Sequence, residues 1–202
     1  MNTRERILLT ALQLFARNGY EAVSVSDIAG SLGMTKGALY RHYQNKKDIF
    51  NSILMRMEER DAEQAGDHGL PEGTATEMED AYRAASIDQI IEFSKTMFRY
   101  WTQDSFAVQF RRMLTLEQFR DEEMGILYHQ YLVSGPLQYL TDLFTGLELP
   151  YPKESAVNFY APMFLLYSIF DSAEDKEAVL AFMDNILECA RIHLKGEKAN
   201  DS

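Results

Sequence analysis

Apolar side chains recur every three or four residues along nearly the whole chain, and this spacing places them on one face of an α-helix. The first such stripe comprises Ile7, Leu8, Ala11, Leu12 and Phe15. Gly19 follows it, where a glycine in a left-handed turn can end the helix. No stretch alternates apolar and polar side chains as a half-buried strand does. The sequence therefore predicts an all-α fold.

Two short helices joined by a turn are predicted near the N-terminus. Ser24 can cap the first helix, because Asp27 follows three residues later as in a capping box. Gly33 interrupts the helical pattern, and Thr35 is placed to cap a second helix that runs to about Tyr43. A pair of short helices whose second member exposes cations and tyrosines is typical of a helix-turn-helix DNA-binding motif.

Charge is unevenly distributed along the sequence, which has a formal net charge of −11 at pH 7. Residues 1–50 contain seven Lys or Arg and four Asp or Glu, whereas the rest of the chain contains 13 basic and 27 acidic side chains. A negative net charge repels nucleic acid, so binding to DNA requires a local basic surface that dominates within a Debye length of about 10 Å. The N-terminal segment has the excess of basic side chains that such a surface needs.

The second short helix supplies the candidates for reading DNA sequence. If Leu39 points inward, then Lys36, Gly37 and Arg41 are turned largely outward. Lys36 and Arg41 are the candidates for base edges, because charged donors reach guanine acceptors. Gly37 and Ala38 allow close approach to the groove, and the Ala38 methyl can meet a thymine methyl.

Other side chains around this helix are better suited to the DNA backbone. Tyr40, His42 and Lys46 are predicted to donate to phosphates, which fixes the register of the protein without reading sequence. The starts of the two helices add three further candidates: Ser24, Ser26 and Thr35. Each residue taken alone can equally be a solvated surface group. Their joint placement around one inward Leu39 favours DNA binding.

The stretch "VSVSDIAGSLGMTKGALYRHYQNKKDIF", preceded by "ALQLFARNGYEA", resembles the N-terminal region of the TetR family of transcriptional regulators. The resemblance covers about residues 4–54. The residues that carry it, in family order and spacing, are Phe15, Gly19, Ser24, Ile28, Ala29, Gly33, Gly37, Leu39, Tyr40 and Lys46. This sequence departs from the family pattern at Tyr43, where Phe is common, and at Lys47, where Glu is common. Lys47 can add a phosphate contact.

The resemblance implies a helical homodimer whose two recognition helices read a near-palindromic operator in double-stranded DNA. It also implies a C-terminal domain that senses a small molecule, and repression as the mode of action. We therefore predict a helix-turn-helix DNA-binding domain at residues 1–48 and a larger helical effector-binding and dimerisation domain at residues 49–202. The alternative is a DNA-binding protein of the same fold without a small-molecule effector, acting architecturally or under the control of a protein partner.

The last two helices indicate the surface through which two copies associate. In "KESAVNFYAPMFLLYSIF", one apolar stripe contains Val157, Tyr160, Ala161, Phe164 and Leu165, and a second contains Phe159, Met163, Leu166 and Phe170. A helix that is apolar on two sides needs two partners. The helix that follows is also broadly apolar, so we expect a homodimer through the last two helices. A monomer with an ordinary buried helix is the alternative.

Aromatic and methionine side chains in the C-terminal part are candidates for an effector pocket. The predicted lining consists of Met97, Trp101, Phe110, Met113, Tyr128 and Phe164, because soft methionine surfaces accommodate varied apolar ligands. Glu117 interrupts an apolar stripe and can pair with a cationic ligand. The alternative is that the apolar side chains fill the core and that Glu117 lies in water at a helix end.

An enzyme is not expected. His42, His68, His129 and His193 are scattered, and neither metal-ligand spacing nor a phosphate-binding glycine loop occurs. The single Cys189 forms no internal disulfide, and no cofactor is predicted. No run of about 18 apolar residues is present and the N-terminal segment lacks the pattern of a secretory signal, so the prediction is a cytoplasmic protein without a membrane partner.

Overall fold

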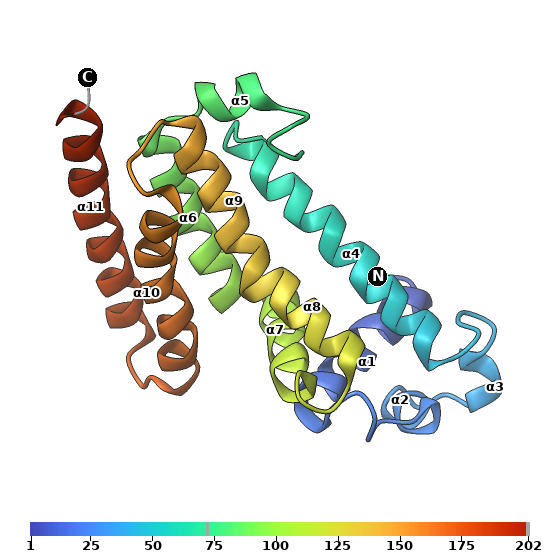
Figure 1. The fold of residues 1–202 in the computed structure, drawn as a ribbon. Helices are drawn as coiled ribbons and strands as arrows, with labels where there is room; N and C mark the ends of the chain where they lie inside the picture. Colours follow the sequence, from blue (N-terminus) through green and yellow to red (C-terminus); the bar gives the residue numbers. More distant parts are fainter. Residues whose placement is uncertain (72, 201–202) are drawn as a thin grey trace. The chain divides into compact units, whose positions relative to one another are not determined.

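The computed structural model describes residues 1–71 and 73–200 (Figure 1). All regular secondary structure in this part of the chain is helical, which confirms the all-α prediction. Glu72 and the last two residues of the predicted domain 49–202 lie outside the described residues. No described helix is long and apolar enough to span a bilayer.

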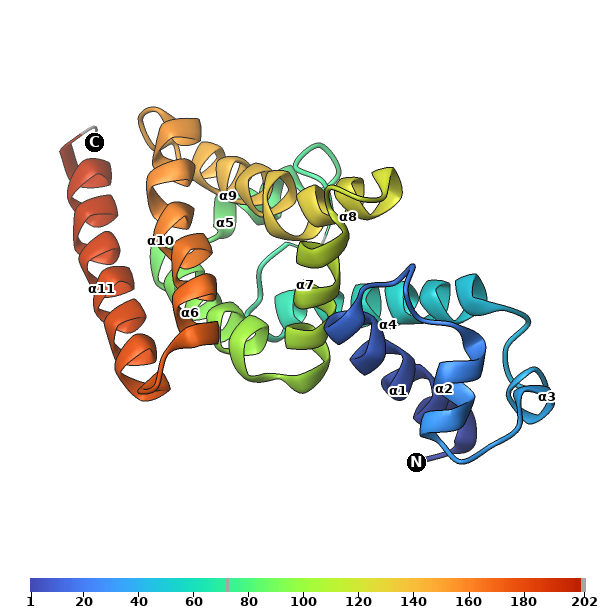
Figure 2. The same ribbon diagram turned by 90° about the horizontal axis from the view of Figure 1, so that it is seen from below.

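The chain forms two compact units, and each is built from segments that are separate in the sequence. The N-terminal unit consists of residues 1–60 and 104–128. It contains α1 (Thr3–Asn18), α2 (Val25–Ser31), α3 (Lys36–Leu39), most of α4 (Lys46–Asp67), α7 (Ser105–Glu117) and the start of α8 (Glu122–Leu132). Within this unit, α3 lies at the end opposite α7 (Figures 1 and 2).

The C-terminal unit consists of residues 61–103 and the chain from residue 129 onward. It contains the end of α4, the end of α8, α5 (Glu79–Ala84), α6 (Ile87–Gln103), α9 (Ser134–Gly146), α10 (Pro152–Ser172) and α11 (Lys176–Asn200). Thus α4 and α8 are the two helices that begin in the N-terminal unit and end in the C-terminal unit.

The N-terminal unit is centred on α1, whose predicted apolar stripe is buried in full. α1 packs against α7, a helix that comes much later in the sequence. Gly19 ends α1 with a φ of 88°, and its N–H donates to the Phe15 carbonyl at 2.9 Å. A side chain at Gly19 would overlap the Glu117 carboxylate, so the turn needs a glycine for its backbone angle and for space.

The C-terminal unit packs α10 against α9, α6 and α11. Charged side chains join α11 to α6: Arg99 pairs with Asp184 at 2.5 Å, and Lys95 pairs with Glu188 at 2.5 Å. The large apolar side chains that are exposed on the described part of the last two helices are Val157, Phe164, Leu165, Ile169, Phe182 and Ile192. α10 therefore has one buried apolar side and a second apolar side that is open within a single copy of the chain.

Candidate nucleic-acid interface

A capping box starts α2, as predicted. The Ser24 hydroxyl accepts from the Asp27 N–H at 3.2 Å, and the Ser24 N–H donates to the Asp27 carboxylate at 2.8 Å. Hydrogen bonds from the Ser24 side chain and then its backbone hold the pKa of Asp27 below its ordinary value. Because the folded state has the lower pKa, this stabilisation is present at neutral pH and is lost as the pH falls through that pKa.

The turn after α2 has the predicted geometry. Gly33 has a φ of +64°, and the Met34 N–H donates to the Ala29 carbonyl oxygen at 3.0 Å, which folds the chain back on α2. The Thr35 hydroxyl then caps α3 by accepting from the Ala38 N–H at 3.2 Å. Leu39 is fully buried, as the helix-turn-helix interpretation requires.

α3 is shorter than predicted. The expected helix reached about Tyr43, whereas α3 ends at Leu39. The N–H groups of Arg41 and His42 then bond to carbonyls three residues back, which is the tighter winding common at helix ends. Tyr43 follows as a buried side chain whose hydroxyl donates to the Arg4 carbonyl at 3.2 Å.

The ten residues predicted to contact DNA all belong to the N-terminal unit. Eight of them are exposed: Ser24, Ser26, Thr35, Lys36, Gly37, Tyr40, Arg41 and His42. Ala38 and Lys46 are half-buried. The Lys36 ammonium lies 5.7 Å from the centre of the Tyr40 ring. Buried Leu39 therefore underlies a surface rich in cations and hydroxyl groups, while DNA contact by each residue stays a prediction.

Lys46 already has an acceptor within the N-terminal unit. Its ammonium donates to the Tyr20 carbonyl at 2.9 Å and lies 4.1 Å from the centre of the Tyr20 ring. Burial, followed by the nearby charges of Glu21, Glu123 and Asp121, raises the pKa of Tyr20 to about 12, so its ring stays neutral at physiological pH. A phosphate bound by Lys46 would share the ammonium with this carbonyl or displace it.

Gly37 is a glycine that the protein fold does not require. A Cβ at Gly37 would meet no atom of the described residues within 4 Å, and its φ lies outside the positive range that favours glycine. Gly30 on α2 is open in the same way. Since packing within the chain explains neither glycine, the two positions form a matched pair for testing close approach by DNA.

We expect Gly37→Ala to lower DNA affinity about tenfold, because the added methyl occupies space next to the groove. The same change should raise the free energy of unfolding by about 0.5–1 kcal/mol, since alanine restricts the unfolded chain. Fluorescence anisotropy with labelled duplex and chemical denaturation measure the two effects. Gly30→Ala serves as the control and should leave affinity within about twofold. Equal losses from both variants would contradict a special role for Gly37.

The residues predicted to line an effector pocket are divided between the two units. Phe110, Met113, Glu117 and Tyr128 belong to the N-terminal unit, whereas Met97, Trp101 and Phe164 belong to the C-terminal unit. Phe110 and Met113 are fully buried on α7, and Phe164 is exposed on α10. A pocket formed by these residues stays a prediction.

Glu117 does not lie in water, so this part of the alternative is wrong. Its side chain is 1% exposed at the end of α7, against Gly19 and 3.7 Å from the Arg120 guanidinium. The stripe that Glu117 interrupts packs inside the N-terminal unit, and no local pattern in the sequence predicts that Gly19 lies opposite Glu117. Its pairing with a cationic ligand remains a prediction.

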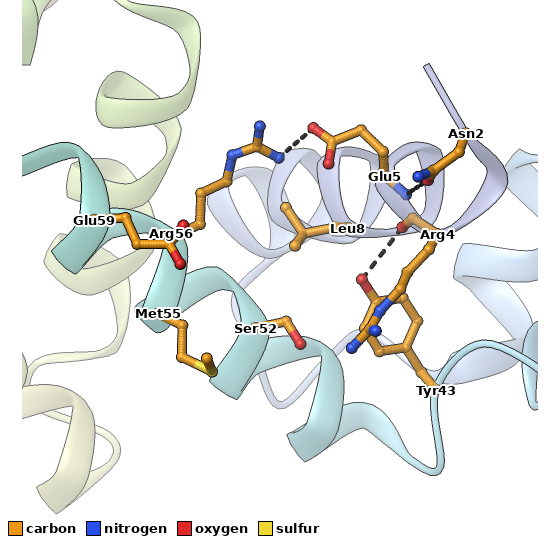
Figure 3. A pocket seen from close by; sticks show the side chains of 9 residues that line it. All are labelled: Asn2, Arg4, Glu5, Leu8, Tyr43, Ser52, Met55, Arg56 and Glu59. Atoms are coloured by element: carbon orange, nitrogen blue, oxygen red, sulfur yellow. Dashed lines mark hydrogen bonds and ion pairs between the residues drawn. The ribbon is translucent and has the colours of Figure 1, made fainter.

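A groove of about 380 Å³ that no sequence pattern predicts lies between α1 and α4 in the N-terminal unit (Figure 3). Its lining residues are Asn2, Arg4, Glu5, Leu8, Tyr43, Ser52, Met55, Arg56 and Glu59. The Arg4 guanidinium lies 5.0 Å from the centre of the Tyr43 ring, and Arg56 pairs with Glu5. None of the residues predicted to bind DNA or an effector lines this groove.

Comparison with known proteins links the N-terminal unit to a family of regulators. The family model described as "Bacterial regulatory proteins, tetR family" matches residues 7–53. The HTH-type transcriptional repressor BepR of Brucella suis is 46% identical over 54 residues, which is 27% of this chain and 26% of that relative. The chain thus matches about a quarter of the length of BepR.

Two further similarities extend beyond this segment. The HTH-type transcriptional repressor AcnR of Corynebacterium efficiens is 30% identical over 158 residues, which covers 72% of this chain and 84% of that relative. The solved structure of the fatty acid degradation regulator FadR from Bacillus halodurans matches with a TM-score of 0.65 and 17% sequence identity. That match covers 95% of this chain and 96% of the FadR chain, so the two share a fold.

Proposed function

Because the chain belongs to the TetR family of DNA-binding transcriptional regulators, a family that is not enzymatic, we propose that it is a repressor released from its operator by a small molecule. The observation that carries this proposal is the exposed set of cations and hydroxyl groups around buried Leu39. The names of BepR and AcnR support repression as the mode of action. The location that suits this role is the cytoplasm.

In the proposed complex, α3 lies in the major groove of the operator. Lys36 and Arg41 donate to base edges, while Gly37 and Ala38 allow the backbone to approach. Tyr40, His42 and Lys46 bind phosphates, together with the helix starts at Ser24, Ser26 and Thr35. The local excess of basic side chains in residues 1–50 offsets the negative net charge at this surface.

Two copies of the chain associate through α10 and α11 in this proposal. Support comes from the exposed apolar side chains on these helices, since Leu165 is 60% exposed and Phe182 is 57% exposed in a single copy. The dimer presents two α3 helices to two half-sites, which accounts for a near-palindromic operator.

We propose that an effector releases the protein from operator DNA by changing the distance between the two α3 helices of the dimer. α4 begins in the N-terminal unit and ends in the C-terminal unit, so it links the effector-binding part directly to the DNA-binding part. An effector that prefers a second arrangement of the dimer shifts the population toward it. A coupling free energy of about 1–3 kcal/mol would lower operator affinity roughly fivefold to 150-fold.

Genome-wide mapping of bound sites tests the DNA-binding part of the proposal. We expect a near-palindromic sequence beside a small set of promoters, and purified protein should retain those fragments at low ionic strength. Failure to retain any sequence selectively would overturn the proposal. A thermal-shift screen of the full chain with small molecules tests the effector. A ligand that stabilises the protein and leaves operator affinity unchanged would eliminate the switch and favour control by another partner.

Alanine variants separate base reading from phosphate binding. We expect Lys36→Ala to lower operator affinity by about 1–3 kcal/mol and to relax preference at particular base pairs. Lys46→Ala should weaken specific and random DNA alike and reduce the salt slope by about one. Anisotropy titrations at several salt concentrations measure both effects. Lys153→Ala, which removes an exposed charge on α10, is the control for net charge. If Lys36→Ala lowered affinity equally for specific and random DNA, Lys36 would not be a residue that reads bases.

A further inference from the structure

An ion pair joins the first turn of α4 to the first turn of α8. The Lys47 ammonium donates to the Glu123 carboxylate within the N-terminal unit. The side chains are 44% and 55% exposed, so the ammonium can be reached by another acceptor from solvent. Lys47 is also one of the two positions where this chain departs from the family pattern, which commonly has glutamate there. The lysine at this position is therefore paired with a carboxylate of the same unit, that of Glu123.

The backbone around Glu123 fixes where its side chain can lie. The Asp121 carboxylate accepts from the Met124 N–H at 2.9 Å and so caps the start of α8. Met124 is 1% exposed, which anchors the residue after Glu123 in the core. Gly125 packs so closely that an added Cβ would lie 2.9 Å from the Gln118 carbonyl oxygen. Glu123 is thus held on the outer side of a tight corner between α7 and α8.

The two neighbouring lysines at the start of α4 have different acceptors. Lys46 donates to the backbone carbonyl of Tyr20 and has the Glu21 carboxylate 3.8 Å away, whereas the hydrogen-bond acceptor of Lys47 is itself a carboxylate, that of Glu123. Lys47 also lies over the Phe50 ring, with its ammonium 4.8 Å from the ring centre. A DNA phosphate that approaches the start of α4 would meet Lys47 with its charge already neutralised by Glu123. The carboxylate and the phosphate compete for one cation.

We propose that Lys47 is an additional contact to the DNA backbone and that Glu123 competes with the phosphate for it, so that α8 limits the affinity of the N-terminal unit for DNA. This inference rests on the proposed DNA-binding function. α8 extends to Leu132 in the C-terminal unit, where the Leu132 carbonyl accepts from the buried Tyr160 hydroxyl at 2.9 Å. The competing carboxylate is therefore carried by a helix whose other end is bound to α10.

Variants of the full chain in which a glutamate is replaced by uncharged glutamine test the competition between Glu123 and the phosphate. Glu123→Gln should tighten binding about twofold to fivefold on a duplex selected from a random pool by the wild-type protein. It should also steepen the salt slope by about 0.9, because one more phosphate is neutralised. Glu122→Gln is the matched control: Glu122 is exposed at the preceding position and has no ion pair within residues 1–71 and 73–200. It removes the same charge and should leave the salt slope unchanged.

The same substitutions on a Lys47→Gln background show whether the effect passes through Lys47. There we expect Glu123→Gln and Glu122→Gln to become indistinguishable. The inference is overturned if the two single variants already match, or if the excess effect of Glu123→Gln persists without Lys47. Thermal unfolding checks that all variants are folded. If the wild-type protein selects no duplex, the proposed DNA-binding function fails instead, so the two failures are distinguishable.

Discussion

Leu39→Ala is expected to lower the free energy of unfolding of the N-terminal unit by about 2–5 kcal/mol and to abolish operator binding. Leu39 is fully buried and is the buried residue of α3, a helix of only four residues that cannot be stable by itself. The cavity left by the missing side chain would release α3 and the cations that it positions. Chemical denaturation followed by circular dichroism and anisotropy with operator DNA measure the two losses.

Leu116→Ala is the matched control for this experiment. Leu116 belongs to the same unit and is 41% exposed on α7, so the substitution removes the same atoms from a surface that is already partly hydrated. It should cost less than about 1 kcal/mol and leave DNA binding intact. If Leu39→Ala and Leu116→Ala behaved alike, Leu39 would not be the anchor of the DNA-binding surface.

Leu165→Glu is expected to convert the proposed dimer into monomers and to weaken operator binding by at least about a hundredfold. Leu165 is on the exposed apolar side of α10, and a carboxylate buried there without a partner would oppose association. In a dimer bound through one α3 helix, the second α3 helix is held at a high effective concentration near the other half-site. A monomer loses this gain. Sedimentation analysis and anisotropy on full and half operators test both consequences.

Leu116→Glu controls for the general effect of placing a charge on an exposed leucine. It lies on α7 and should leave the oligomeric state unchanged. The half-operator affinity of Leu165→Glu should also stay near the wild-type value, because α3 is untouched. A Leu165→Glu protein that remained dimeric would place the dimer contact on another surface.

Local features of the N-terminal unit were predictable because they depend on residues close together in the sequence. The Ser24 and Asp27 pair, the turn at Gly33 and the Thr35 cap each follow from side chains two to four positions apart. The buried stripe of α1 follows from helical spacing alone. The end of α3 was misplaced because propensity does not determine where a helix gives way to a tighter turn.

Contacts between distant segments were not predictable from local patterns. The apolar stripe on α7 has the same appearance whether it packs on α1 or on the helices that precede and follow it. The structure assigns α7 to the unit that contains α1. Pocket candidates chosen by side-chain type, such as Phe110 and Trp101, consequently belong to different units. The predicted boundary after residue 48 separates the residues expected to bind DNA from those expected to bind an effector. The packing of α7 against α1 does not test that boundary, which stays a prediction.

The contact between Gly19 and Glu117 has a consequence for how the sequence can diverge. A residue with a side chain at position 19 would strain the backbone at its φ of 88° and would also displace the Glu117 carboxylate, which is the end of a flexible side chain. The backbone strain would remain even if position 117 had first acquired a shorter side chain. We therefore expect descendants of this protein to keep glycine at position 19, including those in which position 117 has changed.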